Sequence, residues 1–131
     1  MAVTTTQTVD VTSALETLLN SVEGLRAYRY VADNVRVPAA VIAMPSVTFN
    51  DPDSGFHGAR WEFPVSLIVS RNADRAAQDA LARMLSEVAQ AIWTTEVDGV
   101  YSIEATTAVP VSITVSGQEL PAYTLRVIAR A

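Results

Sequence analysis

The residues that could carry chemistry are concentrated in one polar segment, residues 50–62. His57 is the only histidine of the chain, and it lies in the glycine-containing stretch "GFHGA". A catalytic dyad would also need a nucleophile and an orienting partner placed by the fold. A single histidine without such partners is weak evidence for a catalytic site. We therefore expect His57 to be an exposed loop residue, and we expect no catalytic residue in this segment.

The same segment has acidic residues at part of a calcium-loop spacing. Asp51, Asp53 and Glu62 fall at the first, third and twelfth positions of such a loop. The fifth position is Gly55, and the sixth, where the loop requires glycine, is Phe56. The flanking residues also alternate like strands rather than helices. We expect turn-forming acids here, with no cofactor and no metal site beyond a weak, adventitious cation.

The composition favours a single domain, residues 1–131, with a hydrophobic core. Half of the residues are hydrophobic, and the formal net charge is −5. Proteins that grip phosphate backbones need clustered cations, so we expect no specific binding of nucleic acid. All nine cations are arginine, which suits protein interfaces, although the codon bias of a GC-rich genome explains the same composition.

Cysteine and long apolar segments are absent from the sequence. Without cysteine there is neither a disulfide framework nor a thiolate metal site. The first residues, "MAVTTTQTVDV", lack a cationic region and an apolar run, so we expect no signal peptide. The longest apolar stretch, residues 37–45, is far shorter than the roughly 20 residues that span a bilayer. We expect a soluble protein made in the cytoplasm, with no membrane partner.

The first amphipathic helix is predicted in "DVTSALETLLNSVEG", where leucines recur at helical spacing. Ser13 and Glu16 fit a capping box, with Asp10 and Thr12 as alternative caps. Gly24 stands where a left-handed residue ends a helix.

The second helix is predicted after the turn "RNAD", with Asn72 or Asp74 as its cap. Asp79 and Arg83 are spaced i, i+4 on its polar side and are expected to form an ion pair. Its apolar stripe contains Leu81, Met84, Leu85, Val88 and Ile92.

The clearest strand is predicted in "RWEFPVSLIVS", which alternates with period two. Pro64 lacks a backbone donor, which favours an edge position or a bulge. Residues 47–59 are rich in turn formers and link this strand to a preceding one as a hairpin. That preceding strand, residues 39–44, is apolar on both sides, which predicts that it is buried on both sides or covered by a partner. "RAYRY" predicts a short strand before it.

Three more strands are predicted in the C-terminal third, over 101–105, 109–116 and 123–130, the last two joined by the turn "SGQELP". The predicted order is α, β, β, β, α, β, β, β. We expect an α+β fold with a single mainly antiparallel sheet and two helices packed on one face. The other face should carry Ser, Thr and small apolar residues near its centre, open to solvent or a neighbouring subunit.

Two stretches, "GLRAYRYVADNVRVPAAVIAMPS" and "RWEFPVSLIVSRNADRAAQDALARML", carry a family resemblance. An initial helix leads to "GLR", two tyrosines and a proline-containing strand. A loop, an aromatic strand, an "N-DR" turn and an amphipathic helix follow. This pattern resembles the tail terminator, or neck, proteins of long-tailed bacteriophages, particularly those that infect high-GC actinobacteria. The resemblance covers roughly residues 10–95.

The resemblance implies a structural virion protein in the neck region, assembled in the host cytoplasm, with no enzymatic activity. It implies a homo-oligomeric, hexameric ring that caps the tail tube and then joins it to the head–tail connector or stopper protein. The major tail tube protein is therefore an expected partner. DNA is expected to pass through the acidic lumen without specific binding.

A ring requires a heterologous contact that closes by rotation. The strand 39–44 and the polar side of the second helix are our candidates for that contact, and residues 47–58 for reaching the tube or connector. On this hypothesis, replacing both Arg75 and Arg83 with Glu blocks ring closure. The candidate protein–protein residues are Asn50, Asp51, Asp53, Phe56, His57, Arg71, Arg75 and Arg83.

Two alternatives stay open. The first is another neck or head–tail connector adaptor protein, which would share the same kind of surface. The second is a small ligand-binding or enzymatic domain of a host cytoplasm, which needs a pocket with converging polar groups. The sequence offers such a pocket only His57, Asp51 and Asp53.

Overall fold

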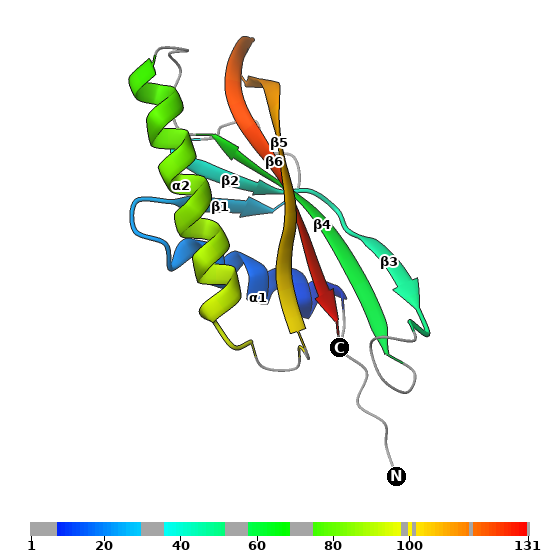
Figure 1. Cartoon of the computed structure of the whole chain (residues 1–131). Coiled ribbons are helices and arrows are strands. Elements are labelled where there is room, and N and C mark those ends of the chain that lie inside the picture. The colour runs from blue at the N-terminus through cyan, green and yellow to red at the C-terminus, as the bar shows by residue number, and fades with distance from the viewer. Residues whose placement is uncertain are drawn as a thin grey trace.

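The computed structural model describes residues 8–29, 36–51, 58–68, 75–97, 100, 102–115 and 117–130. These residues form two helices and six strands, which confirms an α+β protein with a mostly antiparallel sheet (Figure 1). In chain order the elements are α1 (Thr8–Asn20), β1 (Arg26–Arg29), β2 (Ala39–Ile42), β3 (Ser46–Phe49), β4 (Ala59–Ile68), α2 (Arg75–Thr94), β5 (Ser102–Val115) and β6 (Gln118–Arg130).

The sheet has the strand order β1-β2-β4-β6-β5, and β3 pairs with β4 on the side where β2 also pairs. Only β1 and β2 run parallel among the described strands, and the other pairs are antiparallel. The outer strands are therefore β1 and β3 on one side and β5 on the other. The predicted antiparallel pairing of residues 39–44 with the next strand is confirmed for β2 and β4. The predicted turn over 47–59 is wrong at its start, because Ser46–Phe49 form β3, which also pairs with β4.

The main hydrophobic core joins both helices to alternate residues of β4. Trp61, Phe63, Val65 and Leu67 are each at most 3% exposed, as the period-two pattern predicts. They form one cluster with residues of α1 and α2, and each fully buried side chain of this size contributes about 2 kcal/mol. The predicted stripe of α2 is confirmed: Leu81, Val88 and Ile92 are buried in the cluster, and Met84 and Leu85 pack against it.

The predicted capping box of α1 is wrong, because the helix already includes Thr8. Ser13 and Glu16 lie further along it, and both accept hydrogen bonds from Arg29 of β1. Residues spaced i, i+3 project from the same side of a helix, so the spacing that suggests a cap also suits an anchor for a neighbouring strand. Gly24, with φ of 80°, is left-handed as predicted.

Pro64 lies in an interior strand, because β4 pairs with β6 along its length and with β2 and β3 on its other side. The register shifts by one residue between β2 and β3, which places a bulge opposite Pro64. The Pro64 carbonyl accepts a hydrogen bond from Ala43 N at 2.9 Å. The missing Pro64 donor faces this irregular joint, so the edge alternative is wrong and the bulge alternative is right.

The two strands predicted over 101–105 and 109–116 are one strand, β5, which contains a second bulge. Ala105 is opposite Val127 and Thr107 is opposite Arg126, so Thr106 is an extra residue. Ile103 and Ala105 therefore share the side of the main core, whereas Val111 and Ile113 lie on the other side of the sheet. This exchange of sides is why one 14-residue strand has the alternation of two.

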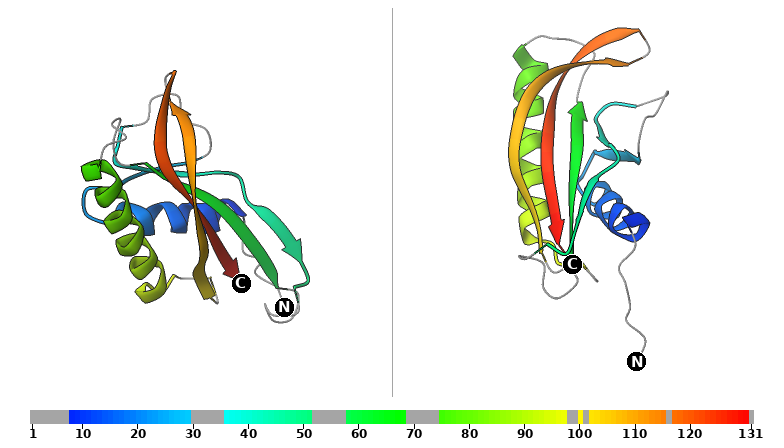
Figure 2. Two further views of the ribbon diagram at one scale, coloured as in Figure 1. Left: turned by 45° about the horizontal axis from the view of Figure 1, so that its top comes forward. Right: turned by 90° about the vertical axis from the view of Figure 1, so that its right-hand side faces the viewer.

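The predicted turn "SGQELP" is too long. The strands extend to Val115 and Gln118, and the left-handed Gly117, with φ of 78°, lies between them. Leu120 and Pro121 are paired with residues of β5. The resulting hairpin is long and curved, and its tip extends beyond the end of β4 (Figure 2).

We call the sheet face that carries Arg60, Glu62 and Pro64 the second face. Towards the hairpin tip it has its own small core of Ile68, Leu120 and Ala122, against which Val37, Val111 and Ile113 pack. The prediction of burial on both sides of residues 39–44 is right for Ala39 and Ala40, which are fully buried, and wrong for Met44, which is 71% exposed.

Candidate protein–protein interface

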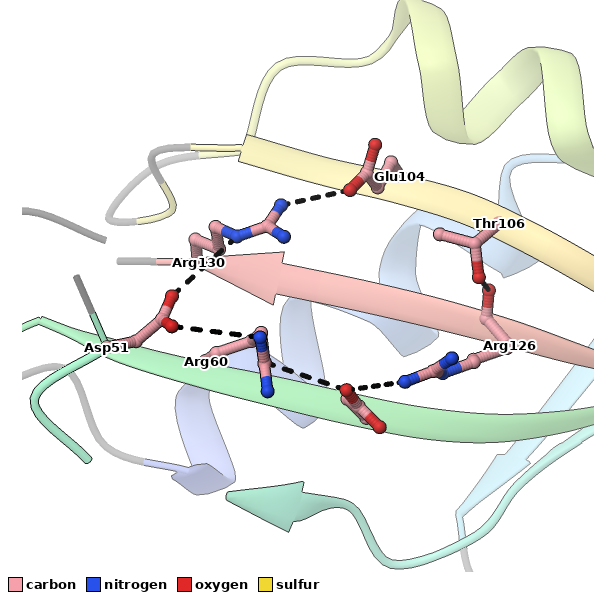
Figure 3. A network of polar contacts seen from close by, with 7 residues as sticks. Asp51, Arg60, Glu104, Thr106, Arg126 and Arg130 are labelled. Carbon is pink, nitrogen blue, oxygen red and sulfur yellow. Dashed lines mark hydrogen bonds and ion pairs between the residues drawn. The ribbon is translucent and has the colours of Figure 1, made fainter. Parts of the chain in front are cut away.

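A chain of ion pairs runs across the second face at the end away from the hairpin tip (Figure 3). Arg130 of β6 contacts Glu104 of β5 at 2.9 Å and Asp51 at 3.8 Å. Arg60 of β4 contacts Asp51 at 3.7 Å and Glu62 at 3.6 Å. Arg126 of β6 is the last residue in this series of ion pairs and lies 2.7 Å from Glu62. We call these six residues the charged chain.

The charged chain balances three arginines against three carboxylates, so it presents no uncompensated cluster for an anion. Asp51 is its centre and is only 3% exposed. The Asp51 carboxylate lies 3.7 Å from Arg60 and 3.8 Å from Arg130, which are distances of charge attraction rather than of hydrogen bonds. This arrangement stabilises the sheet across three strands and corrects our expectation of Ser, Thr and small apolar residues on this face.

The predicted site residues fall into three groups. Asp53, Phe56, His57 and Arg71 lie outside the described residues. Asp51 is buried in the charged chain rather than presented to a partner. Asn50, Arg75 and Arg83 are exposed, and Asn50 has a left-handed backbone, with φ of 53°.

The sequence spacing raised two polar arrangements, an ion pair on α2 and part of a calcium loop, and the structure describes residues of both. Asp79 and Arg83 are both described and exposed, and no ion pair joins them, so the predicted i, i+4 pair is wrong. Asp51 and Glu62, whose spacing matches part of a calcium loop, both form ion pairs with Arg60. Within the described part of the chain, no three acidic or histidine side chains are grouped to hold a metal ion.

Several large apolar side chains of the described residues are exposed, and Val9 and Val109 are just over half exposed. Met44, in the joint between β2 and β3, is 71% exposed, and Phe49, at the other end of β3, is 75% exposed. Trp93, near the end of α2, is 87% exposed. Sequence reasoning overlooked Trp93, although a signal was present: Trp93 directly follows Ile92 of the apolar stripe and therefore points away from the core.

A shallow groove of about 570 Å³ lies beside Trp93. Its walls come from the C-terminal part of α2 and the first residues of β5. The lining residues are Ala89, Trp93, Ile103, Glu104 and Ala105. It is an apolar surface with a carboxylate at its rim, which can take the apolar stem and cationic head of an arginine.

β5 forms the outer edge of the sheet next to this groove, since β6 is its only partner among the described strands. A free strand edge can pair with another chain, and natural proteins limit this with bulges and prolines. The bulge at Thr106 and the exposed Pro110 interrupt the edge beyond Ala105. Ser102–Ala105 precedes both interruptions and is the part of the edge beside Trp93.

No protein-family model and no curated protein sequence matches this chain. Neither described helix combines the length and the hydrophobicity that crossing a bilayer requires.

Proposed function

We propose that this protein is a structural virion protein of a long-tailed bacteriophage, which caps the tail tube as a ring and joins it to the head connector. The observation that carries the proposal is the exposure of Met44, Phe49 and Trp93 on a chain whose other large apolar side chains are mostly buried. Such residues are usually covered by a protein partner. The resemblance of residues 10–95 to tail terminator proteins names the partners.

In this proposal both helices cover one face of the sheet. The support is that buried residues of α1 and α2 belong to the same cluster as Phe63 and Val65 of β4. The second face, on which Arg60 and Glu62 alternate with those residues, is then left for neighbouring subunits or the lumen.

The partners follow from the geometry of a neck ring. The chain contacts copies of itself in a ring, expected to be a hexamer, and the ring contacts the major tail tube protein and the connector or stopper protein. Met44 and Phe49 flank β3 and are our candidates for the contact with the tube or connector. The protein has a net charge of −5, and this acidity lets DNA pass through the ring without specific binding. The protein performs no enzymatic reaction.

The test is labelling of purified particles with a gold-tagged antibody, viewed by electron microscopy. The proposal expects label only at the head–tail junction, and unlabelled particles would contradict it. The phenotype of a deletion then separates the two neck functions. Loss of a terminator gives overlong or headless tails, whereas loss of a head adaptor gives leaking heads beside normal free tails.

A further inference from the structure

The outer strands of the sheet, β1 and β5, carry opposite charges. On β1 and just before β2, Arg26 and Arg36 are exposed, and neither forms an ion pair with another described residue. At the opposite edge, Glu104 of β5 is exposed and lines the groove beside Trp93, and the exposed Glu96 follows Trp93 by three residues in the chain. We call Arg26 and Arg36 the basic edge, and Trp93, Glu96 and Glu104 the acidic edge.

The chemistry of the acidic edge suits a guanidinium group. An indole face attracts a cation, with arginine as the commonest partner, and nearby carboxylates add charge-assisted hydrogen bonds. The groove beside Trp93 is lined by Ala89, Ile103 and Ala105, which can cover the apolar stem of an arginine. An exposed tryptophan with a carboxylate beside it is therefore suited to receive a basic strand edge.

We propose that the acidic edge of one copy receives the basic edge of the next copy, so that β1 lies against the first residues of β5 of its neighbour. This proposal rests on the proposed ring and names its contact. The basic edge and the acidic edge lie at opposite ends of the strand order, with β2, β4 and β6 between them. A single copy therefore cannot join them.

The charges also decide the symmetry of the contact. A two-fold contact through Trp93 would bring Glu96 and Glu104 of one copy against those of the other, which is unfavourable. A head-to-tail contact instead brings carboxylates against Arg26 and Arg36 at every interface. Repetition of such a contact closes into a ring when the rotation between copies allows it.

Sedimentation of mixed variants tests this contact. Trp93→Ser/Glu96→Gln removes the acidic edge, and Arg26→Glu/Arg36→Glu removes the basic edge. Each variant alone should associate roughly tenfold or more weakly than the wild-type chain. A mixture of the two retains one intact edge of each kind, so it should form 1:1 dimers and nothing larger. Glu104 is left unchanged because it also contacts Arg130.

Arg75→Glu/Arg83→Glu is the control on α2, since it reverses two exposed arginines away from both edges. This side of α2 is another candidate for the ring contact that the sequence suggested. The proposal places the contact on the two edges instead, so this variant should assemble like the wild-type chain. Circular dichroism and melting should show that all variants fold. The proposal is overturned by wild-type chains that stay monomeric at high concentration, by normal assembly of either edge variant, by loss of assembly only in the α2 control, or by a mixture that fails to dimerise.

The neck role is tested separately. Particles that carry Arg26→Glu/Arg36→Glu at the head–tail junction in wild-type amount would overturn the contact and leave the neck role standing. Head-to-tail association in solution, with no label on particles, would support the contact and contradict the neck role.

Discussion

Arg29 of β1 donates from Nε to Glu16 of α1 at 3.0 Å, and so ties an outer strand of the sheet to the first helix. The same guanidinium group also donates to Ser13, one helical turn earlier. These contacts join two segments that are close in sequence but differ in structure. They hold β1 in place at the edge where only β2 pairs with it among the described strands.

Replacing Arg29 with Ala should lower the free energy of unfolding by about 1 kcal/mol, because both side chains of the pair are about 30% exposed and solvent screens them. Arg29→Lys should recover only part of the loss, since an ammonium group does not match the two acceptors as a guanidinium group does. Urea denaturation measures both changes. An equal loss in Arg83→Ala, on the exposed side of α2, would contradict this role for Arg29.

The buried carboxylate of the charged chain should matter more. Asp51→Asn keeps the size of the side chain but removes the buried charge that Arg60 and Arg130 share. Because Arg60 keeps Glu62 and Arg130 keeps Glu104, the change should cost about 2 kcal/mol of stability. Asp79→Asn, on the exposed side of α2, is the control and should change stability by less than about 0.5 kcal/mol. The interpretation fails if the two variants denature at the same urea concentration.

Two phenylalanines separate core from surface. Phe63→Ala removes a fully buried ring and should cost about 4 kcal/mol, which combines lost burial with a cavity. Phe49→Ala removes a ring that is 75% exposed and should change the stability of the monomer by less than about 0.5 kcal/mol. Thermal melting at low protein concentration measures both, and a large loss for Phe49→Ala would show that this ring is part of the fold.

The two tryptophans should report separately on the fold and on assembly. Trp61 is 3% exposed and its Nε1 donates to Thr8 Oγ1 at 3.0 Å, whereas Trp93 is 87% exposed. Trp93→Phe should therefore leave blue-shifted emission that acrylamide quenches poorly. Trp61→Phe should leave red-shifted emission that is quenched readily in the monomer and is protected when copies associate. If the emission wavelength and quenching of Trp93 do not change with protein concentration, its burial between copies is contradicted.

Strong periodic patterns predicted the parts of the fold that one element determines by itself. The alternation around Phe63 and the stripe ending at Ile92 both reflect one buried side, so burial follows directly from spacing. Gly24 was predictable for a similar local reason, since its backbone conformation favours glycine. Thr106 was not, because nothing in its residue type distinguishes an extra residue in a strand from the end of that strand.

The charged chain could not be predicted, because it depends on which strands are neighbours. Period-two alternation implies that Arg60 and Glu62 share one side of their strand, and that Arg126 and Arg130 share one side of theirs. Their contact follows only from the register that sets Arg60 opposite Arg130. Asp51 was read as a turn residue for the same reason, since its burial comes from β4 and β6 rather than from its own neighbours. The Ser13 and Glu16 spacing shows the converse error, in which one pattern fits two different structures.

The extra residue at Thr106 also gives the β5–β6 hairpin one residue that it can lose. Ala105 is opposite Val127 and Thr107 is opposite Arg126, so deletion of Thr106 alone would leave both pairs in place and restore simple alternation along β5. Val111 and Ile113 would then stay in the small core around Leu120. Deletion of one residue from a regular strand would instead move every side chain on one side of the deletion to the other face. A deletion of one residue should consequently be tolerated better at Thr106 than within β6.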